Sequence, residues 1–222
     1  MPVISVIIPT LNEGAYLEKT LQLLARNAAR HEVIVSDGGS QDATTRIAVE
    51  QGARLVSTPI PGRSLQMNSG ARIAVGETLL FLHADTRVRN TSLGQIETAL
   101  QRPEVVGGGF ARRFDSGSLF LKLTCSLATW RSRGLGWFLG DQGIFVRREV
   151  FDQLHGFKEM HAFEDLDFSR RLARSGKVVT ISPGIISSAR RFGPRGPFLT
   201  TCSDFRLTCR YLAGRNSDGS EA

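Results

Sequence analysis

The chain has 222 residues, of which 41% are hydrophobic and 22% charged, which is typical of a soluble globular protein with enough chain to bury a core. Its formal charge of +7 favours anionic partners such as nucleotide diphosphates or lipid phosphates. We find no nucleic-acid-binding signature and no zinc-site spacing among the three cysteines, so we expect no nucleic-acid partner. We also find no apolar run of membrane-spanning length and no signal-peptide pattern, so we expect a cytoplasmic protein with no transmembrane span.

The first half of the chain alternates strand and helix patterns. Apolar, β-branched runs predict buried strands at residues 3–8, 32–37, 54–57 and 79–82, with helical patterns between them. Asn12 is a candidate N-cap for the first helix. This alternation predicts parallel βαβ units, whose strands end on one edge of the sheet. We therefore expect Thr10, Asp37 and Asp85, which all follow strand patterns, to line one crevice.

The second half is less regular. It predicts helices at residues 92–101, 149–154, 163–174 and 198–212, and strands at 105–114, 144–146, 178–181 and 185–186. An apolar stripe from Leu119 to Trp130 favours core packing, with a greasy acceptor site as the alternative. A second stripe, from Phe198 to Leu212, favours a core or a dimer face. A homodimer through this last helix and a peripheral membrane contact both stay open.

Two acidic segments can carry chemistry. The apolar run at residues 79–82 ends in His83 and Asp85, and a carboxylate at a strand end can bind a divalent cation and, through it, a diphosphate. A turn capped by Asp is the alternative. The second segment contains Glu164 and Asp165. Acidic residues stabilise the first turn of a helix, but Asp165 shares a partly apolar face with Leu172, so we expect it to point into the protein as a general base.

Four further residues have two interpretations each. Arg63 meets a diphosphate or begins a solvated helix. Arg190 and Arg191 bind phosphate or form an exposed pair. Asp141 lies in a glycine-rich loop, where it contacts an acceptor sugar or shapes the turn.

Five segments resemble, in order and spacing, the motifs of glycosyltransferase family 2, the inverting GT-A enzymes that use nucleotide sugars. These segments are Val6–Glu13, Asp37–Asp42, Met67–Ala71, Phe81–Asp85 and Glu164–Asp165. The resemblance implies an α/β GT-A fold, in which a Rossmann-like, mostly parallel sheet is flanked by helices and joined to a mixed C-terminal acceptor-side part. We expect a single domain over residues 1–222, with a nucleotide-sugar-binding half (1–90), an acceptor and catalytic half (91–215) and a tail (216–222).

The resemblance also implies roles for individual residues. Asp85 would hold Mg²⁺ or Mn²⁺ against the diphosphate of a UDP-sugar or, as second choice, a GDP-sugar. Asp165, beside Glu164, would deprotonate the hydroxyl of a sugar, lipid-linked or small-molecule acceptor, with Asp141, Arg190 and Arg191 on the acceptor side. The donor would contact Pro9, Thr10, Leu11, Glu13, Asp37, Gly38, Arg63, Asn68, His83 and Ala84.

The chain departs from the family pattern in two places. His83 stands where the family has the first Asp of its Asp-x-Asp motif. The Gln-x-x-Arg-Trp element of processive members is missing, and Arg190–Phe192 stands roughly there instead, so we expect single transfer by a short soluble enzyme. A catalytically silent nucleotide-sugar-binding module is the non-enzyme alternative. A sugar-nucleotide pyrophosphorylase or a nicotinamide dehydrogenase would need a glycine-rich loop after the first strand, which Pro9–Asn12 does not offer.

Overall fold

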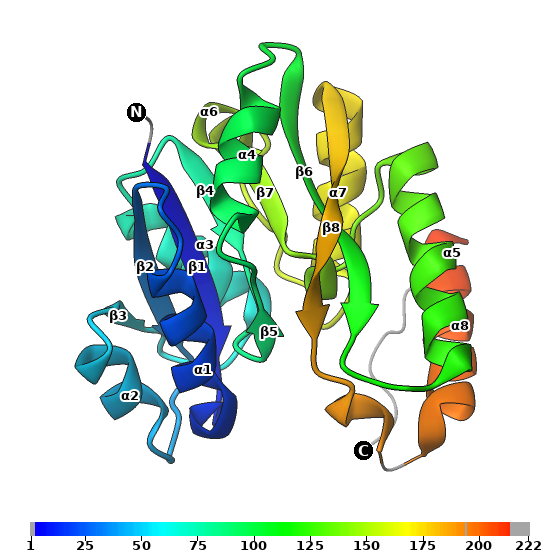
Figure 1. The fold of residues 1–222 in the computed structure, drawn as a ribbon, viewed down its shortest axis with the longest axis horizontal. Helices are drawn as coiled ribbons and strands as arrows, with labels where there is room; N and C mark the ends of the chain where they lie inside the picture. The colour runs from blue at the N-terminus through cyan, green and yellow to red at the C-terminus, as the bar shows by residue number, and fades with distance from the viewer. Residues whose placement is uncertain (1–2, 194, 214–222) are drawn as a thin grey trace.

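The computed structural model describes residues 3–193 and 195–213, and the expected tail at 216–222 lies outside them. The described strands form one eight-stranded sheet in the order β3-β2-β1-β4-β7-β6-β8-β5 (Figure 1). The strands are β1 (Ile4–Thr10), β2 (His31–Asp37), β3 (Arg54–Ser57), β4 (Thr78–Phe81), β5 (Thr86–Arg87), β6 (Val105–Phe114), β7 (Ile144–Arg147) and β8 (Lys177–Ser187). The helices are α1 (Gly14–Ala25), α2 (Thr44–Glu50), α3 (Arg63–Ile73), α4 (Ser92–Leu100), α5 (Leu119–Leu135), α6 (Arg148–Gln153), α7 (Glu164–Ser175) and α8 (Gly196–Leu212), with 3-10 turns η1 (Gly140–Gln142) and η2 (Arg190–Phe192).

The first four strands of the sheet order run parallel, as the alternating pattern predicts. β1 pairs with β2 on one side and with β4 on the other, and Thr10 lies opposite Asp37 in the register. β4 ends at Phe81, two residues before His83 and four before Asp85. The carboxyl ends of β1, β2 and β4 therefore bring these polar residues to one edge of the sheet.

The remaining strands make the sheet mixed, which confirms the expected C-terminal part. β7 is antiparallel to both β4 and β6, whereas β8 runs parallel to β6 and antiparallel to β5. The two short strands predicted at residues 178–181 and 185–186 are one strand, because the register along β6 continues past Gly184 with a local shift. The two-residue strand β5 carries too little pattern for a sequence prediction.

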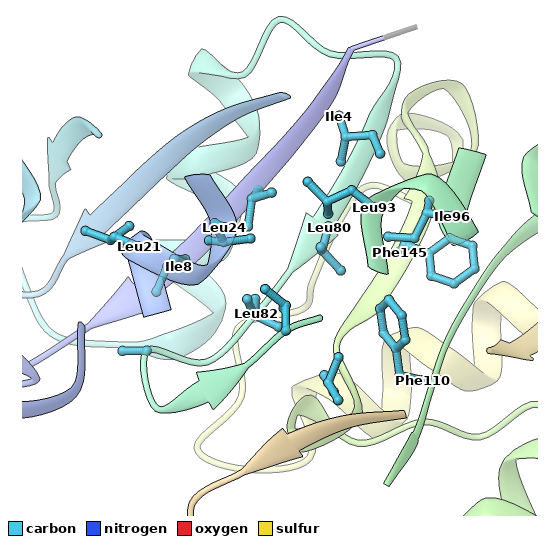
Figure 2. Packing of buried hydrophobic residues seen from close by; sticks show 14 of the residues in the cluster. Ile4, Ile8, Leu21, Leu24, Leu80, Leu82, Leu93, Ile96, Phe110 and Phe145 are labelled. Atoms are coloured by element: carbon cyan, nitrogen blue, oxygen red, sulfur yellow. The ribbon is translucent and has the colours of Figure 1, made fainter. Parts of the chain in front are cut away.

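Helices cover both faces of the sheet. Along β1, Ile4, Val6 and Ile8 pack on one face against α1 and α4, whereas Ile7 packs on the other face against α3. Figure 2 shows the first cluster, in which Leu21 and Leu24 of α1 and Leu93 and Ile96 of α4 lie over the strands. The second face also receives α6 and α7, through Phe151, Phe168 and Leu172. The packing on both faces therefore positions the strand ends at the edge of the sheet.

The core packing expected for the α5 stripe is wrong, and of the two alternatives for the α8 stripe, a core or a dimer face, the core is wrong. The α5 stripe expected in the core is exposed, with Leu119 80% and Trp130 74% accessible, and the helix packs on the sheet through the opposite face with Leu121, Cys125 and Ala128. The α8 stripe is likewise not core, because each of its described residues keeps solvent exposure.

Asn12 is also not the N-cap of α1. The N-cap position is Glu13, and no side chain caps it. The amide oxygen of Asn12 instead accepts a hydrogen bond from the backbone N–H of Gln41 at 2.8 Å, and its own N–H donates to Ser40 Oγ at 2.8 Å. Asn12 therefore joins the loop after β1 to the loop after β2.

Candidate active site

A buried glutamine ties together the strand ends that form the floor of the site. Gln66 of α3 donates from Nε2 to the carbonyl oxygens of Thr10 at 2.6 Å and Ser36 at 2.9 Å. Thr10 is the last residue of β1 and Ser36 is the residue before the last of β2, so one side-chain amide holds the ends of both strands. Sequence reasoning missed this residue, and the only available signal was a polar side chain within the Arg63–Ile73 helix.

Asp37, at the end of β2, orders the loop that follows it. One of its carboxylate oxygens accepts hydrogen bonds from Thr10 Oγ1 (3.0 Å) and Ser40 Oγ (2.5 Å), and the other accepts from the backbone N–H groups of Gly39 (2.9 Å) and Ser40 (2.8 Å). Burial works to raise the pKa of Asp37, but these hydrogen bonds outweigh it and hold the pKa below its ordinary value. A carboxylate offers about four lone-pair positions, so the protein itself occupies those of Asp37.

Arg190 of η2 reaches back over the sheet edge and joins two carboxylates. Its guanidinium contacts Glu13 Oε1 at 2.6 Å and Asp85 Oδ2 at 2.9 Å, and it lies over the ring of Tyr16. Burial raises the pKa of Asp85 above its ordinary value despite the opposing charge of Arg190, and Glu13 adds to the rise. The carboxylates at residues 13 and 85 therefore share one positive charge.

The same two carboxylates suit a hard divalent cation. Such cations take oxygen ligands, and Glu13 Oε2 is buried without a hydrogen-bond partner among the residues that the structure describes. No group of three or more His, Cys, Asp or Glu side chains within the described parts of the chain converges on a metal position. Asp85 and Glu13 therefore fit a cation whose remaining ligands come from outside the protein, such as the oxygens of a diphosphate.

Asp165 lies in the first turn of α7, and its carboxylate is held by two backbone donors. Gly140 N–H donates to Oδ2 and Leu166 N–H donates to Oδ1, both at 2.6 Å. Burial raises the pKa of Asp165 to about 6, the charge of Glu164 adds to the rise, and the two hydrogen bonds oppose it. The side chain points into the protein, as the shared face with Leu172 predicts, and a carboxyl with this pKa is ionised at neutral pH.

His83 and Asp165 approach each other across Gly140. A Cβ atom at Gly140 would lie only 2.5 Å from His83 Nε2 and 3.2 Å from Asp165 Oδ2, so only glycine fits between them. His83 Nε2 is buried and has no hydrogen-bond partner in the described part of the structure. Burial, with the charge of Arg63 next in size, lowers the pKa of His83 to about 4, so its ring is neutral at neutral pH.

A small cavity of about 10 Å³ opens beside this pair, close to the volume that one water molecule needs. Its polar residues are His83, Arg63 and Asp165, and Arg63 also forms a 3.4 Å ion pair with the buried Glu164. Its apolar lining consists of Pro9, Met67, Phe81, Leu82, Ile144 and Phe157. The carboxylate of Asp165 therefore faces a confined, mostly apolar space.

Asp141 follows Gly140 in the chain and forms an ion pair with Arg112 of β6 at 3.6 Å. The turn η1 that carries Asp141 is fixed by the buried Gln142, which donates to the carbonyl oxygen of Phe110 at 3.0 Å and accepts from Arg131 of α5 at 3.0 Å. Asp141 is more than a surface turn residue, because its carboxylate is mostly buried against an arginine.

Other expected site residues have structural partners of their own. Both groups of the Asn68 amide bind the backbone of Phe157, at 2.8 and 2.9 Å, so Asn68 holds the segment before α7. The carbonyl oxygen of Ala84 accepts a hydrogen bond from Thr20 at 2.6 Å. Leu11 is exposed, and Arg191 pairs with Asp204 of α8.

The structure brings most of the expected residues to one edge of the sheet. Pro9 lines the cavity, and Gly38 donates to the carbonyl oxygen of Thr10 at 2.9 Å. The charges of Arg63, Asp141, Arg190 and Arg191 all affect the pKa of His83. Their roles in binding or catalysis stay predictions.

Comparison with known proteins adds family evidence. Residues 5–154 match the model of a family described as "Glycosyl transferase family 2". A "4,4'-diaponeurosporenoate glycosyltransferase" of Staphylococcus haemolyticus is 37% identical over 94 residues, covering 39% of this chain and 25% of the relative. A "PGL/p-HBAD biosynthesis glycosyltransferase" of Mycobacterium bovis is 29% identical over 211 residues, covering 86% of this chain and 78% of the relative. The chain spans 25% and 62% of the length of the first two curated relatives that it matches.

The fold has close counterparts among solved structures. A mannosyltransferase from Pyrobaculum calidifontis, in complex with GDP-Man and Mn²⁺, superposes with a TM-score of 0.77 at 21% identity, covering all of this chain and 66% of the other. At this identity the likeness concerns the fold, and it bears out the GT-A architecture. The matched family region ends at residue 154, before Asp165.

Proposed function

Because this chain belongs to glycosyl transferase family 2, we propose that it transfers a sugar, with inversion, from a nucleoside diphosphate sugar to an acceptor hydroxyl. The observation that carries the proposal is a pair of partly buried carboxylates, Asp85 in the turn after β4 and Asp165 in the first turn of α7. Asp85 shares the guanidinium of Arg190 with Glu13, and Asp165 faces a confined cavity. Such a transfer requires a cation beside the leaving diphosphate, which Asp85 would hold, and a base beside the attacking hydroxyl, which Asp165 would supply.

Asp85 and Glu13 would hold Mg²⁺ or Mn²⁺ together with the diphosphate, after Arg190 turns away. When bound, the cation offsets the negative charge that develops on the leaving group. Glu13 Oε2, which is buried without a hydrogen-bond partner among the described residues, supports this assignment because a bound cation would be its partner.

Asp165 would accept the proton of the acceptor hydroxyl. The N–H groups of Gly140 and Leu166 fix its carboxylate, so its direction does not depend on substrate. A general base whose pKa lies near the operating pH gives efficient proton transfer. The pKa of Asp165, about 6, meets that requirement.

The proposal also covers the nucleotide base of the donor, the class of acceptor and the cellular location of the enzyme. We favour UDP-sugars first and GDP-sugars second, a single transfer to a sugar, lipid-linked or small-molecule acceptor, and a cytoplasmic enzyme. Because Asp37 is saturated by protein donors, base selection would come from the shape of the loop that it orders rather than from its own oxygens.

Calorimetry of UDP and GDP binding, with Mn²⁺ and with EDTA, tests the metal assignment. We expect Asp85→Ala to lose metal-dependent binding while keeping its melting temperature within a few degrees, because Arg190, which loses this ion pair, keeps its pair with Glu13. Asp204→Ala, which removes the partner of Arg191 at the surface, is the matched control and should bind as wild type does. Equal affinity in EDTA and Mn²⁺ would remove the metal from the proposal, and binding without any transfer would favour a silent module.

A further inference from the structure

The α5 and α8 helices form an exposed apolar surface. Leu119, Leu123, Leu127 and Trp130 recur at helical spacing along α5, and all are more than half exposed. Phe198, Leu199, Phe205 and Leu212 are exposed along α8. The two stripes meet where the rings of Phe120 and Phe198 pack 5.6 Å apart. The helices stand side by side at the right of Figure 1, and we call this set of residues the α5–α8 surface.

The α8 helix is oriented opposite to an ordinary surface helix, which buries its apolar stripe. Its half-buried side chains are mainly polar, and Thr200, Asp204 and Thr208 are among them. Several of its large apolar side chains are exposed, with Phe205 70% accessible. An orientation that exposes the apolar stripe is stable in water only at a cost, so the stripe is suited to a partner that covers it.

The charges on the helices of the α5–α8 surface are mainly positive. The two helices carry five Lys or Arg side chains and a single acid, Asp204, which is already paired with Arg191. Lys122, Arg206 and Arg210 are exposed beside the apolar stripes. A hollow of about 310 Å³ next to α8 is lined by Arg191 and Arg195 together with Thr200, Ser203 and Asp204, a mainly donor-rich set.

We propose that the α5–α8 surface docks on an anionic phospholipid membrane. Apolar side chains that include Trp and Phe, flanked by Lys and Arg, are the composition that binds the boundary between headgroups and acyl chains. The flanking cations add attraction to anionic lipid. The docked helices would lie on the membrane, and among the described residues no helix is both long and apolar enough to cross it.

Two other occupants fit the surface less well. A second copy of the chain would bring the same unpaired cations together, and like charges across an interface oppose association. Residues 214–222 read Gly-Arg-Asn-Ser-Asp-Gly-Ser-Glu-Ala and offer no large apolar side chain to cover the stripe. Charge complementarity therefore favours the anionic membrane.

The surface is connected to the candidate active site through both helices. Arg131 of α5 holds Gln142 in the turn beside Asp165, and Tyr211 of α8 stacks on Phe163, the residue before Glu164, with ring centroids 5.1 Å apart. Docking would therefore place the segments that carry Asp165 next to the membrane.

Vesicle sedimentation with the full chain tests the proposal, using phosphatidylcholine vesicles with and without one quarter phosphatidylglycerol. We expect binding to the anionic vesicles that weakens as salt rises. Leu123→Ser with Phe205→Ser, and separately Arg206→Gln with Arg210→Gln, should each weaken it at least about tenfold. The control Val49→Ser with Val75→Ser changes exposed apolar residues elsewhere and should bind as wild type does.

Trp130 supplies an independent readout, because it is one of only two tryptophans in the chain. We expect its fluorescence to shift to the blue when anionic vesicles are added, and Trp130→Phe to lose that shift while still sedimenting. Absence of wild-type binding, binding by both double variants that equals that of wild type, or a dimer in light scattering that Leu123→Ser with Phe205→Ser dissociates would each overturn the proposal. Circular dichroism confirms that each variant is folded before its binding is compared.

Discussion

At the scale of single residues, Asp165 has the most strongly altered carboxyl environment in the site. Burial and the neighbouring Glu164 favour its neutral form, and the Gly140 and Leu166 N–H groups favour the carboxylate. The sequence indicates the like-charged neighbour and the helix start but not the burial, which is the largest cause. The balance leaves Asp165 ionised at neutral pH, with a pKa of about 6 that lies close enough to neutrality for it to accept a proton.

Replacing Asp165 by Asn should separate binding from chemistry. The amide keeps the shape and removes the proton acceptor, and a well-placed base contributes roughly 10²–10⁴-fold. We expect donor affinity close to wild type and transfer at least about a hundredfold slower, measured by calorimetry and by single-turnover assays with acceptor. Asp167→Asn, in the same helical turn but paired with Arg171, is the control. Transfer by Asp165→Asn at near wild-type rate would move the base to Glu164 or Asp141.

The transfer rate should depend on pH through the same carboxyl. Because its pKa is about 6, Asp165 is protonated and inactive below that pH, so the rate should rise through pH 6 and level off above about 7. Glu164→Gln removes a negative neighbour that raises this pKa, and it leaves Arg63 to favour the carboxylate, so the midpoint should move to lower pH. A midpoint that stays unchanged or moves up in the single-turnover profile would contradict the assignment.

At the scale of elements, Gln66 connects α3 to the ends of β1 and β2. Gln66→Leu keeps most of the volume but leaves the carbonyl oxygens of Thr10 and Ser36 buried without this donor, which costs about 1–3 kcal/mol. Urea unfolding measures this loss in the free energy of unfolding. Gln22→Leu, at an exposed position of α1, should stay within about 0.5 kcal/mol of wild type, and an equal effect of both changes would deny Gln66 a special role.

The sequence predicts most elements because their patterns are local. Strand–helix alternation is visible in residues 3–82, and the helix bounds differ from the structure by a few positions. The α5 stripe shows what a local pattern does not contain. Leu119, Leu123 and Trp130 predict an amphipathic helix correctly, but periodicity does not say whether the apolar stripe or the small-residue face of Leu121, Cys125 and Ala128 meets the sheet.

The candidate site was predictable to the extent that it follows from parallel topology. Thr10 contacts Asp37, and Asp85 follows β4 at the same edge, because parallel strands end on one edge. Side-chain partners between distant segments were not predictable. Arg190 lies 177 residues from Glu13 along the chain, and only the folded structure shows that it joins Glu13 to Asp85. Gly140 was likewise missed, because nothing local shows that His83 and Asp165 approach it.

At the scale of the whole molecule, stability should reside in the sheet and the helices that cover its faces. Each described residue of α8 keeps solvent exposure, so a chain that ends at Gly193 should lose only a few degrees in melting temperature, at about 2–4 °C per kcal/mol. Leu172→Ala, in the fully buried face of α7, should cost about 2–5 kcal/mol. Calorimetric melting compares the two. A truncation as damaging as Leu172→Ala would contradict this view of α8.

The bridge from Arg190 to Glu13 and Asp85 has a consequence for the kinetics of donor capture. Under the metal assignment that we propose, the guanidinium would have to leave both carboxylates before a metal-bound diphosphate engages them, so collision alone would not complete binding. In stopped-flow mixing, the observed association rate should therefore approach a plateau as donor concentration increases, with the plateau equal to the rate at which η2 swings away. The resting protein sets its own upper limit on how fast it can be loaded.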